Sequence, residues 1–174
     1  MILPIITYPN KQLKLRSSVV VNFDNLLHRF LDDMFETMMS SNGIGLAAIQ
    51  VANPIRALIL CIPDEEGEQS KENIIEIINP VIHNPTGNVL YQEGCLSVPG
   101  FYEDVERYES LTLHYQNRHG EACVLEANEL LAIAIQHEID HLEGKLFIEK
   151  LTYNRRKKFE KEYKKALKEK KQSS

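Results

Sequence analysis

Residues 128–142 read NELLAIAIQHEIDHL, and this stretch decides the fold. Its first half is apolar on every side, which is typical of a helix buried in a core rather than one lying on a surface. Asn128 is a good N-cap and Gly144 a good stop, so the pattern predicts a helix that ends at about Leu142. We expect the rest of the chain to surround this helix.

The same stretch carries the strongest chemical signal, His137-Glu138-Ile139-Asp140-His141. Residues four apart lie on one helical face, so His137 and His141 can hold one metal ion from a rigid support. Glu138 is turned away from that face by about 100°, where it can reach a water bound to the ion. This is the H-E-x-x-H arrangement of zinc hydrolases, with glutamate as general base. This segment follows an apolar helical stretch, so its two histidines and two acidic residues would cost free energy to bury unless each had a partner. This cost favours a metal site.

A catalytic site of this kind needs a third protein ligand and an open fourth position. No histidine follows His141, and the best upstream donor is Cys95, within EGCLS at residues 93–97. Its neighbouring glycine permits tight backbone geometry near an ion. Cys61 and Cys123 lie in apolar or strand-like stretches, and we interpret them as small buried hydrophobes. Three scattered cysteines do not make a disulfide framework, and a reducing cytoplasm is the expected compartment.

A third segment, residues 43–50, reads GIGLAAIQ. Gly43 and Gly45 permit close approach of the backbone to a ligand, and Gln50 can donate a hydrogen bond to an oxygen. Taken alone, the Gly-x-Gly pattern is common, and it indicates a helix stop followed by a turn.

The rest of the chain predicts helices at both ends and strands between them. A short helix is expected at 10–16, and an amphipathic helix begins at Asp24 and ends near Gly43. Short apolar or alternating runs predict strands at 57–62, 74–78, 111–115 and 123–125, with an exposed loop at 64–72 and Asn79-Pro80 ending the second strand. This order predicts an α+β fold, with mostly antiparallel sheets around the buried central helix and further helices near both termini.

Composition and charge narrow the class of protein. The chain has 174 residues, of which 43% are hydrophobic and 26% charged, as in one soluble globular domain. No apolar run is long enough to span a membrane, and the N-terminus lacks the pattern of a signal peptide.

The charge is unevenly distributed. Residues 150–174 carry 11 Lys+Arg against 3 Asp+Glu, a net charge of +8, whereas the remaining 149 residues carry −13. A last helix is expected from Thr152, with Phe159, Tyr163 and Leu167 as a narrow apolar stripe. This basic helix is either a solvated surface element or a docking element for a polyanion such as ribosomal RNA. We assign residues 1–150 to a catalytic domain and residues 151–174 to the basic tail of that same domain.

Together, GIGLAAIQ, EGCLS and HEIDH resemble the peptide deformylase family, which is marked by Gly-x-Gly-x-Ala-Ala-x-Gln, Glu-Gly-Cys-Leu-Ser and His-Glu-x-x-His in this order. The resemblance covers residues 1 to about 150. It implies metal-dependent removal of the formyl group from the N-terminal methionine of newly synthesised polypeptides in bacteria or organelles. A monomer that does not bind membranes is the family-based expectation.

The resemblance also implies a role for each motif residue. Cys95, His137 and His141 bind the metal, usually Fe²⁺, for which Zn²⁺, Ni²⁺ or Co²⁺ can substitute. Glu138 is the acid and base. The side chain of Gln50 and the backbone N–H of Leu96 stabilise the oxyanion.

Residues beside the motifs are candidates for substrate binding: Gly43, Ile44, Gly45, Gly94, Leu130, Ile133 and Ala134. The glycine segment can pair with the substrate backbone as an added strand. The apolar members can line a pocket for the methionine side chain, and plain core packing explains them about equally well. Glu93 and Asp140 are candidates for supporting the metal ligands, with Arg107 as a partner for Asp140. Some family members carry an arginine shortly after the Cys-Leu-Ser segment, where this chain has Val98-Pro-Gly-Phe-Tyr102.

Two other functions compete with deformylation. A metallopeptidase would use the same H-E-x-x-H, but its common downstream ligand is missing here. A ribosome- or RNA-binding module with a structural metal would need a fourth protein ligand, and none stands near these motifs.

Overall fold

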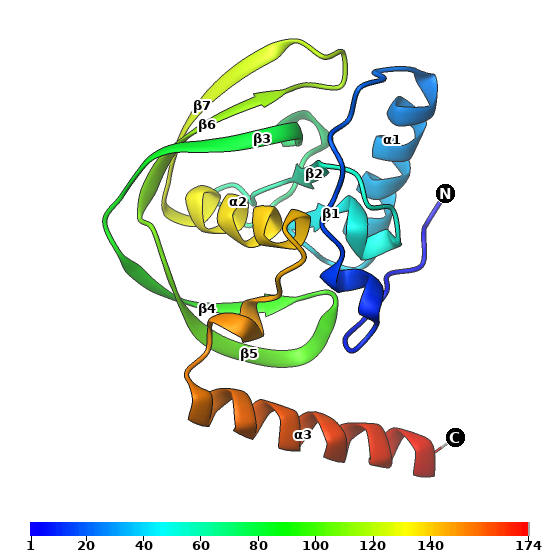
Figure 1. Cartoon of the computed structure of the whole chain (residues 1–174). Helices are drawn as coiled ribbons and strands as arrows, with labels where there is room; N and C mark the ends of the chain where they lie inside the picture. Colours follow the sequence, from blue (N-terminus) through cyan, green and yellow to red (C-terminus); the bar gives the residue numbers. More distant parts are fainter. Residues whose placement is uncertain (174) are drawn as a thin grey trace.

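The computed structural model describes residues 1–173, which form an α+β fold with two antiparallel sheets (Figure 1). The longer helices are α1 (Asn25–Ser40), α2 (Glu129–Leu142) and α3 (Tyr153–Gln172). A five-stranded sheet has the order β1 (Gly45–Ala47), β2 (Ala57–Leu60), β3 (Ile75–Thr86), β6 (Ser110–Gln116), β7 (Ala122–Asn128), and β4 (Val89–Cys95) pairs with β5 (Val98–Arg107) as a separate hairpin. Short 3₁₀ helices are η1 (Lys11–Lys14), η2 (Ala48–Val51), η3 (Lys71–Asn73) and η4 (Phe147–Lys150). The predicted α+β class with mostly antiparallel sheet is confirmed.

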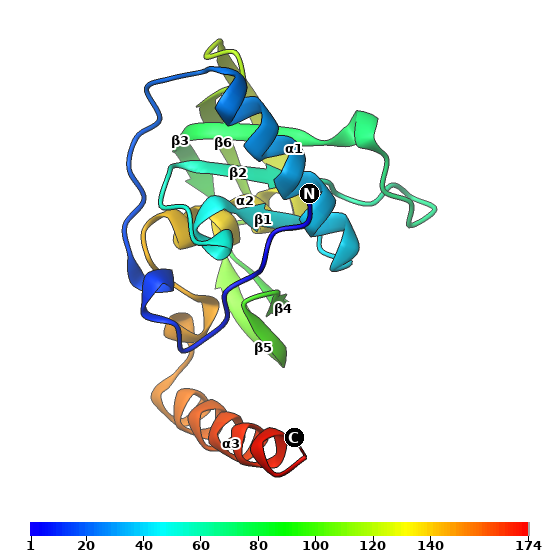
Figure 2. The same cartoon turned by 90° about the vertical axis from the view of Figure 1, so that its right-hand side faces the viewer.

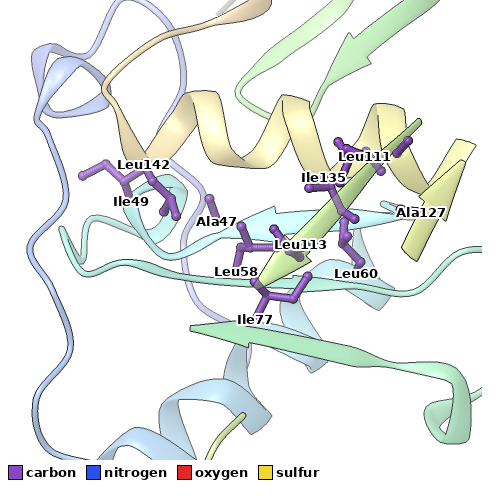
Figure 3. Packing of buried hydrophobic residues seen from close by; sticks show 12 residues of the cluster. Ala47, Ile49, Leu58, Leu60, Ile77, Leu111, Leu113, Ala127, Ile135 and Leu142 are labelled. Atoms are coloured by element: carbon purple, nitrogen blue, oxygen red, sulfur yellow. The ribbon is translucent and has the colours of Figure 1, made fainter. Parts of the chain in front are cut away.

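Helix α2 lies between the five-stranded sheet and the β4–β5 hairpin, as both views show (Figures 1 and 2). Its Ala132 and Ile135 belong to one buried cluster with Leu58 and Leu60 of the sheet. Figure 3 shows Ile135 on the side of α2 that faces the sheet. Each large aliphatic side chain buried in this way contributes about 1.5–3 kcal/mol. The apolar surround of α2 therefore follows from its position between two layers.

Helix α1 covers the opposite face of the same strands. Its Leu31, Met34 and Met38 pack with Ile59 of β2. Successive strand side chains point to opposite faces, so Leu58 and Leu60 face α2 whereas Ile59 faces α1. Strand β2 is buried on both faces, which explains why it is a continuous apolar run instead of an alternating one.

The predicted end of the second strand at Asn79-Pro80 is wrong, because β3 continues to Thr86. Asn79 has φ 52°, and the pairing with β6 shifts register between Ile78 and Val81. Strand β3 therefore continues beyond Asn79-Pro80, with a β-bulge at this dipeptide. The Asn79 side chain donates from Nδ2 to Val20 O at 2.9 Å, which stabilises this conformation.

Two other expectations are corrected. The helix expected at 10–16 is the single 3₁₀ turn η1, and within the segment 43–50 the edge strand β1 begins at Gly45 and is followed by η2 from Ala48, rather than a turn alone. Asn128 does occupy the N-cap of α2, but its side chain makes no capping hydrogen bond within the described residues. Cys61 is fully buried, as predicted, whereas Cys123 is half-buried on β7.

Helix α3 begins after Thr152, whose side chain accepts from Arg155 N, and it lies beneath the β4–β5 hairpin (Figure 1). Phe159 is its buried residue, and Tyr163 Oη donates to Tyr8 O. Of the expected tail at 151–174, Ser174 lies outside the described residues. Within residues 1–173, no helix is both long and apolar enough to cross a membrane.

Candidate metal centre

Two elements bring the predicted metal ligands together. His137 and His141 project from adjacent turns of α2, with ring centroids 5.0 Å apart. Cys95 ends β4, and its Sγ lies 3.4 Å from His141 Nε2. One ligand atom from each of the three residues lies within 4.8 Å of the others. Chain segments more than 40 residues apart in sequence thus converge on one point.

A buried charge network supports His137. Its Nδ1 lies 2.7 Å from Glu93 Oε1, which leaves Nε2 for a metal. Arg107 donates to both oxygens of Glu93, at 2.7 and 2.8 Å, and to Asp140 Oδ2 at 2.6 Å. The expected pairing of Arg107 with Asp140 is confirmed. Burial alone would raise the pKa of Glu93, but its hydrogen bonds from Arg107 and His137 outweigh burial and lower it.

Burial lowers the pKa of both histidines, but the net shifts have opposite directions. It lowers the pKa of His141 well below its ordinary value, which keeps that imidazole neutral as metal ligation requires. Burial also opposes a proton on His137, yet contacts with Cys95 and Glu93 prevail and raise its pKa. A cation bound among these ligands would take the place of that proton.

Glu138 is held beside the ligands without a partner for one oxygen. Its Oε1 lies 4.0 Å from His137 Nε2, and its Oε2 is buried with no hydrogen-bond partner among residues 1–173. Burial raises the pKa of Glu138 to about 7. A carboxyl group of that pKa can both accept and return a proton near neutral pH.

One sulfur and two imidazole donors fit a divalent transition metal. In the part of the chain that the structure describes, no fourth histidine, cysteine or carboxylate joins this set. Three protein ligands leave a coordination position open, as catalytic metal sites do. The unpartnered Oε2 of Glu138 also fits a site that is completed by an ion and its water.

A pocket of about 500 Å³ opens above these ligands. Most predicted site residues line it: Gly43, Ile44, Gly45, Gln50, Gly94, Cys95, Leu96, Leu130, Ile133, Ala134, His137 and Glu138. His141 is fully buried and does not line the pocket. The pocket wall also contains Tyr91 and Gln92, which no sequence pattern predicts at this place. They lie on β4, whose sequence has no recognisable strand pattern.

Two glycines shape the wall by letting side chains approach. A Cβ at Gly45 would lie 3.0 Å from Glu138 Oε1 and 2.7 Å from a Leu60 methyl group. A Cβ at Gly94 would collide with the ring of Tyr102. The ring of Tyr102 therefore covers the backbone next to Cys95.

The backbone of Gly43 is already engaged within the chain. Its N–H donates to Met38 O at 3.0 Å, and its carbonyl accepts from Gln69 Nε2 at 3.0 Å. Gln69 lies in the loop predicted at 64–72, and no sequence signal distinguished it from its polar neighbours. At this edge of β1, Gly45 is therefore better placed than Gly43 to meet a further strand.

The fold and the site define the class of metal-dependent hydrolases, with a helix-borne pair of histidines, a cysteine and a buried glutamate around one pocket. The polypeptide deformylase family model matches residues 2–157. A peptide deformylase of Helicobacter pylori strain J99 is 58% identical over 170 residues, which cover 98% of each chain. The chain belongs to the polypeptide deformylase family.

Solved structures agree with this assignment. A crystal structure of a peptide deformylase from Legionella pneumophila superimposes with a TM-score of 0.89 at 35% identity, covering 98% of both chains. The peptide deformylase from Ehrlichia chaffeensis in complex with actinonin gives a TM-score of 0.86 at 38% identity, covering 95% of this chain and 97% of that one.

Proposed function

We propose that this chain hydrolyses the formyl group from the N-terminal formylmethionine of newly synthesised polypeptides, in the cytoplasm and as a monomer. The observation that carries the proposal is the convergence of Cys95, His137 and His141 within 4.8 Å, beside Glu138, whose Oε2 has no hydrogen-bond partner among residues 1–173. Family membership favours this reaction over the metallopeptidase and RNA-binding alternatives.

Cys95, His137 and His141 would hold the ion, and we propose Fe²⁺, with Zn²⁺, Ni²⁺ or Co²⁺ as substitutes. When bound, the ion supplies Lewis acidity at the end of the pocket where these ligands meet. A thiolate ligand donates charge but is open to oxidation, so the iron-loaded protein is expected to lose activity in air.

Glu138 moves the proton. Its Oε2 accepts a proton from the attacking water, and the oxygen adds to the formyl carbon. As the carbon–nitrogen bond breaks, Glu138 returns the proton to the amine of methionine, and formic acid leaves and ionises to formate. A pKa of about 7 suits both transfers near neutral pH.

The negative charge that develops on the formyl oxygen needs fixed donors. We assign this role to Nε2 of Gln50 and the backbone N–H of Leu96. Gln50 is 1% exposed, so water cannot reorient its amide during the reaction. Removal of one such donor typically costs about 10²–10³-fold in kcat.

The methionine side chain would enter the apolar part of the pocket. Ile44, Leu130, Ile133 and Ala134 line this part, and the last two are 5% and 6% exposed. Their placement on the pocket wall favours substrate contact over plain core packing. The backbone of Gly45 would meet the next residues of the substrate as an added strand.

The basic helix α3 is the proposed ribosome contact and part of the same domain. Phe159 and Tyr163 pack on Tyr8, which ties α3 to the N-terminal segment. The charges of α3 stay exposed, as a contact with phosphates requires. Removal of residues from Thr152 onward should weaken salt-sensitive binding to ribosomes and leave hydrolysis of short peptides intact. Unchanged binding by a folded truncated chain would contradict this role.

The reaction is tested with formyl-Met-Ala-Ser and acetyl-Met-Ala-Ser on anaerobically purified, metal-loaded protein. Formate should be released from the formyl peptide alone, and Glu138→Gln should lower the rate by about 10²–10⁴-fold. Glu149→Gln, at an exposed glutamate, is the matched control. Cleavage of an internal peptide bond would favour the metallopeptidase, and RNA binding without hydrolysis would favour the binding module.

A further inference from the structure

We infer that Ser97 is a positioning residue that fixes the direction of the Gln50 amide; the inference rests on the proposed role of Gln50 as an oxyanion donor. Ser97 is fully buried and lies outside the pocket wall, so it has no route to the substrate. Its hydroxyl nevertheless contacts the side-chain amide of Gln50, which lines the pocket beside Cys95.

The only proton of the Ser97 hydroxyl is committed elsewhere. Ser97 Oγ donates to the backbone carbonyl of Ile6 at 2.8 Å. Towards Gln50 it can therefore act only as an acceptor. Gln50 Nε2 lies 3.1 Å from this oxygen and donates one of its two N–H groups to it.

The other end of the Gln50 amide is fixed by a donor. The backbone N–H of Ala47 donates to Gln50 Oε1 at 2.9 Å. If the amide were flipped, its NH₂ would meet the Ala47 N–H, and its oxygen would meet a hydroxyl without a proton to give. An obligatory acceptor and an obligatory donor thus select one of the two orientations.

The selected orientation directs the second N–H of Gln50 into the site. In the structure, Nε2 donates to Cys95 Sγ at 3.6 Å, and both residues line the pocket. In the flipped orientation this position would hold a carbonyl oxygen, which repels an oxyanion. The Ser97 hydroxyl, together with the Ala47 N–H, therefore holds the orientation in which Gln50 can stabilise the transition state.

The N-terminal segment also binds Gln50 and Ser97 through backbone hydrogen bonds that do not involve the Ser97 hydroxyl. Ile6 N–H donates to Gln50 O at 2.8 Å, and Tyr8 N–H donates to Ser97 O at 2.7 Å. These backbone bonds remain when the hydroxyl is removed. Ser97→Ala thus removes one of the two hydrogen bonds that orient the amide, while the two chain segments stay anchored.

The test measures kcat and KM with formyl-Met-Ala-Ser for Ser97→Ala, Gln50→Ala and the double variant. We expect Ser97→Ala to lower kcat about five- to tenfold with little change in KM, because the lost order matters in the transition state. In the Gln50→Ala background the same change should cost less than about twofold, because there is no amide left to orient. Ser17→Ala is the matched control, since Ser17 is buried and its Oγ has no hydrogen-bond partner among residues 1–173.

An equal loss of kcat in both backgrounds would overturn the inference, because a purely structural role persists without Gln50. No loss in the wild-type background would overturn it as well. If Ser97→Ala fails to fold or to bind metal, Ser97→Cys keeps a similar volume with only a weak acceptor, and the same comparison applies. Absence of formate release by the unmodified protein would instead refute the proposed function, on which the inference rests.

Discussion

Helices α2 and α3 differ in burial and in the residues that they carry. Helix α2 is largely buried and carries two of the metal ligands, whereas α3 is largely exposed and carries many of the basic residues. Nine of the 14 residues of α2 are buried, whereas Phe159 is the one buried residue among the 20 of α3. Burial around α2 changes the acidity of Glu138 and His141, which is what proton transfer and metal ligation need. Helix α3 keeps its charges in water. Hydrolysis should therefore be sensitive to single changes near α2 and tolerant of changes on α3.

The largest effect is expected at a metal ligand. His141→Ala removes one of three ligands at a fully buried position. Metal content, measured by mass spectrometry of the purified protein, should fall to background, and formate release should fall by more than about 100-fold, since even outer partners of ligands cost about 10–100-fold. His119→Ala changes an exposed histidine and is the control. Full metal retention by the folded His141 variant would break the assignment of this residue.

An intermediate effect, on the free energy of unfolding, is expected when a buried arginine beside α2 is compared with an exposed arginine on α3. The Arg107 side chain is 2% exposed and joins Glu93 to Asp140, whereas that of Arg155 on α3 is 52% exposed and lies 3.8 Å from Glu103. Arg107→Met removes the arginine partner of the buried Glu93 carboxylate and one of the two cations beside Asp140, and it should lower the free energy of unfolding by about 3–5 kcal/mol. Arg155→Met should cost less than about 1 kcal/mol. Urea unfolding measures both, and equal values would contradict the contrast.

The smallest effect is expected at the attachment of α3. Tyr163→Phe removes the hydrogen bond from Tyr163 Oη to Tyr8 O while keeping the ring contacts with Tyr8 and Phe159. We expect a loss of about 1 kcal/mol, seen as faster amide hydrogen exchange in α3 and unchanged exchange in α2. Tyr153→Phe, at an exposed tyrosine, is the control. Faster amide exchange in α2 as well would contradict this prediction, because it would show that the stability of α2 depends on the attachment of α3.

The same contrast explains what could be predicted from the sequence. The bounds of α2 and the shared face of its two histidines follow from helical spacing, which is a local property. Cys95 is predicted from its ligand chemistry, although it lies 46 residues from His141. The start of α3 after Thr152 is also local, because the threonine side chain caps the helix.

The features that the sequence did not predict depend on contacts between segments that are distant in the chain. The β4–β5 hairpin had no sequence prediction, because Gly94, Pro99 and Gly100 interrupt its alternation and the pairing between its strands stabilises it. The continuation of β3 past Asn79 depends on a side-chain bond to Val20, 59 residues away. The link from Gln50 through Ser97 to Ile6 spans 91 residues at its second step, so no spacing rule could reveal it.

The central claim is that Cys95, His137 and His141 together hold the catalytic ion. X-ray absorption spectroscopy of the anaerobically metal-loaded protein tests it directly, with Cys95→Ser measured in parallel. The account predicts one sulfur and two imidazole nitrogens around the ion in the unmodified protein, and loss of the sulfur signal in the variant. A shell of oxygen and nitrogen donors without sulfur in the unmodified protein, or an unchanged sulfur signal in the variant, would contradict it.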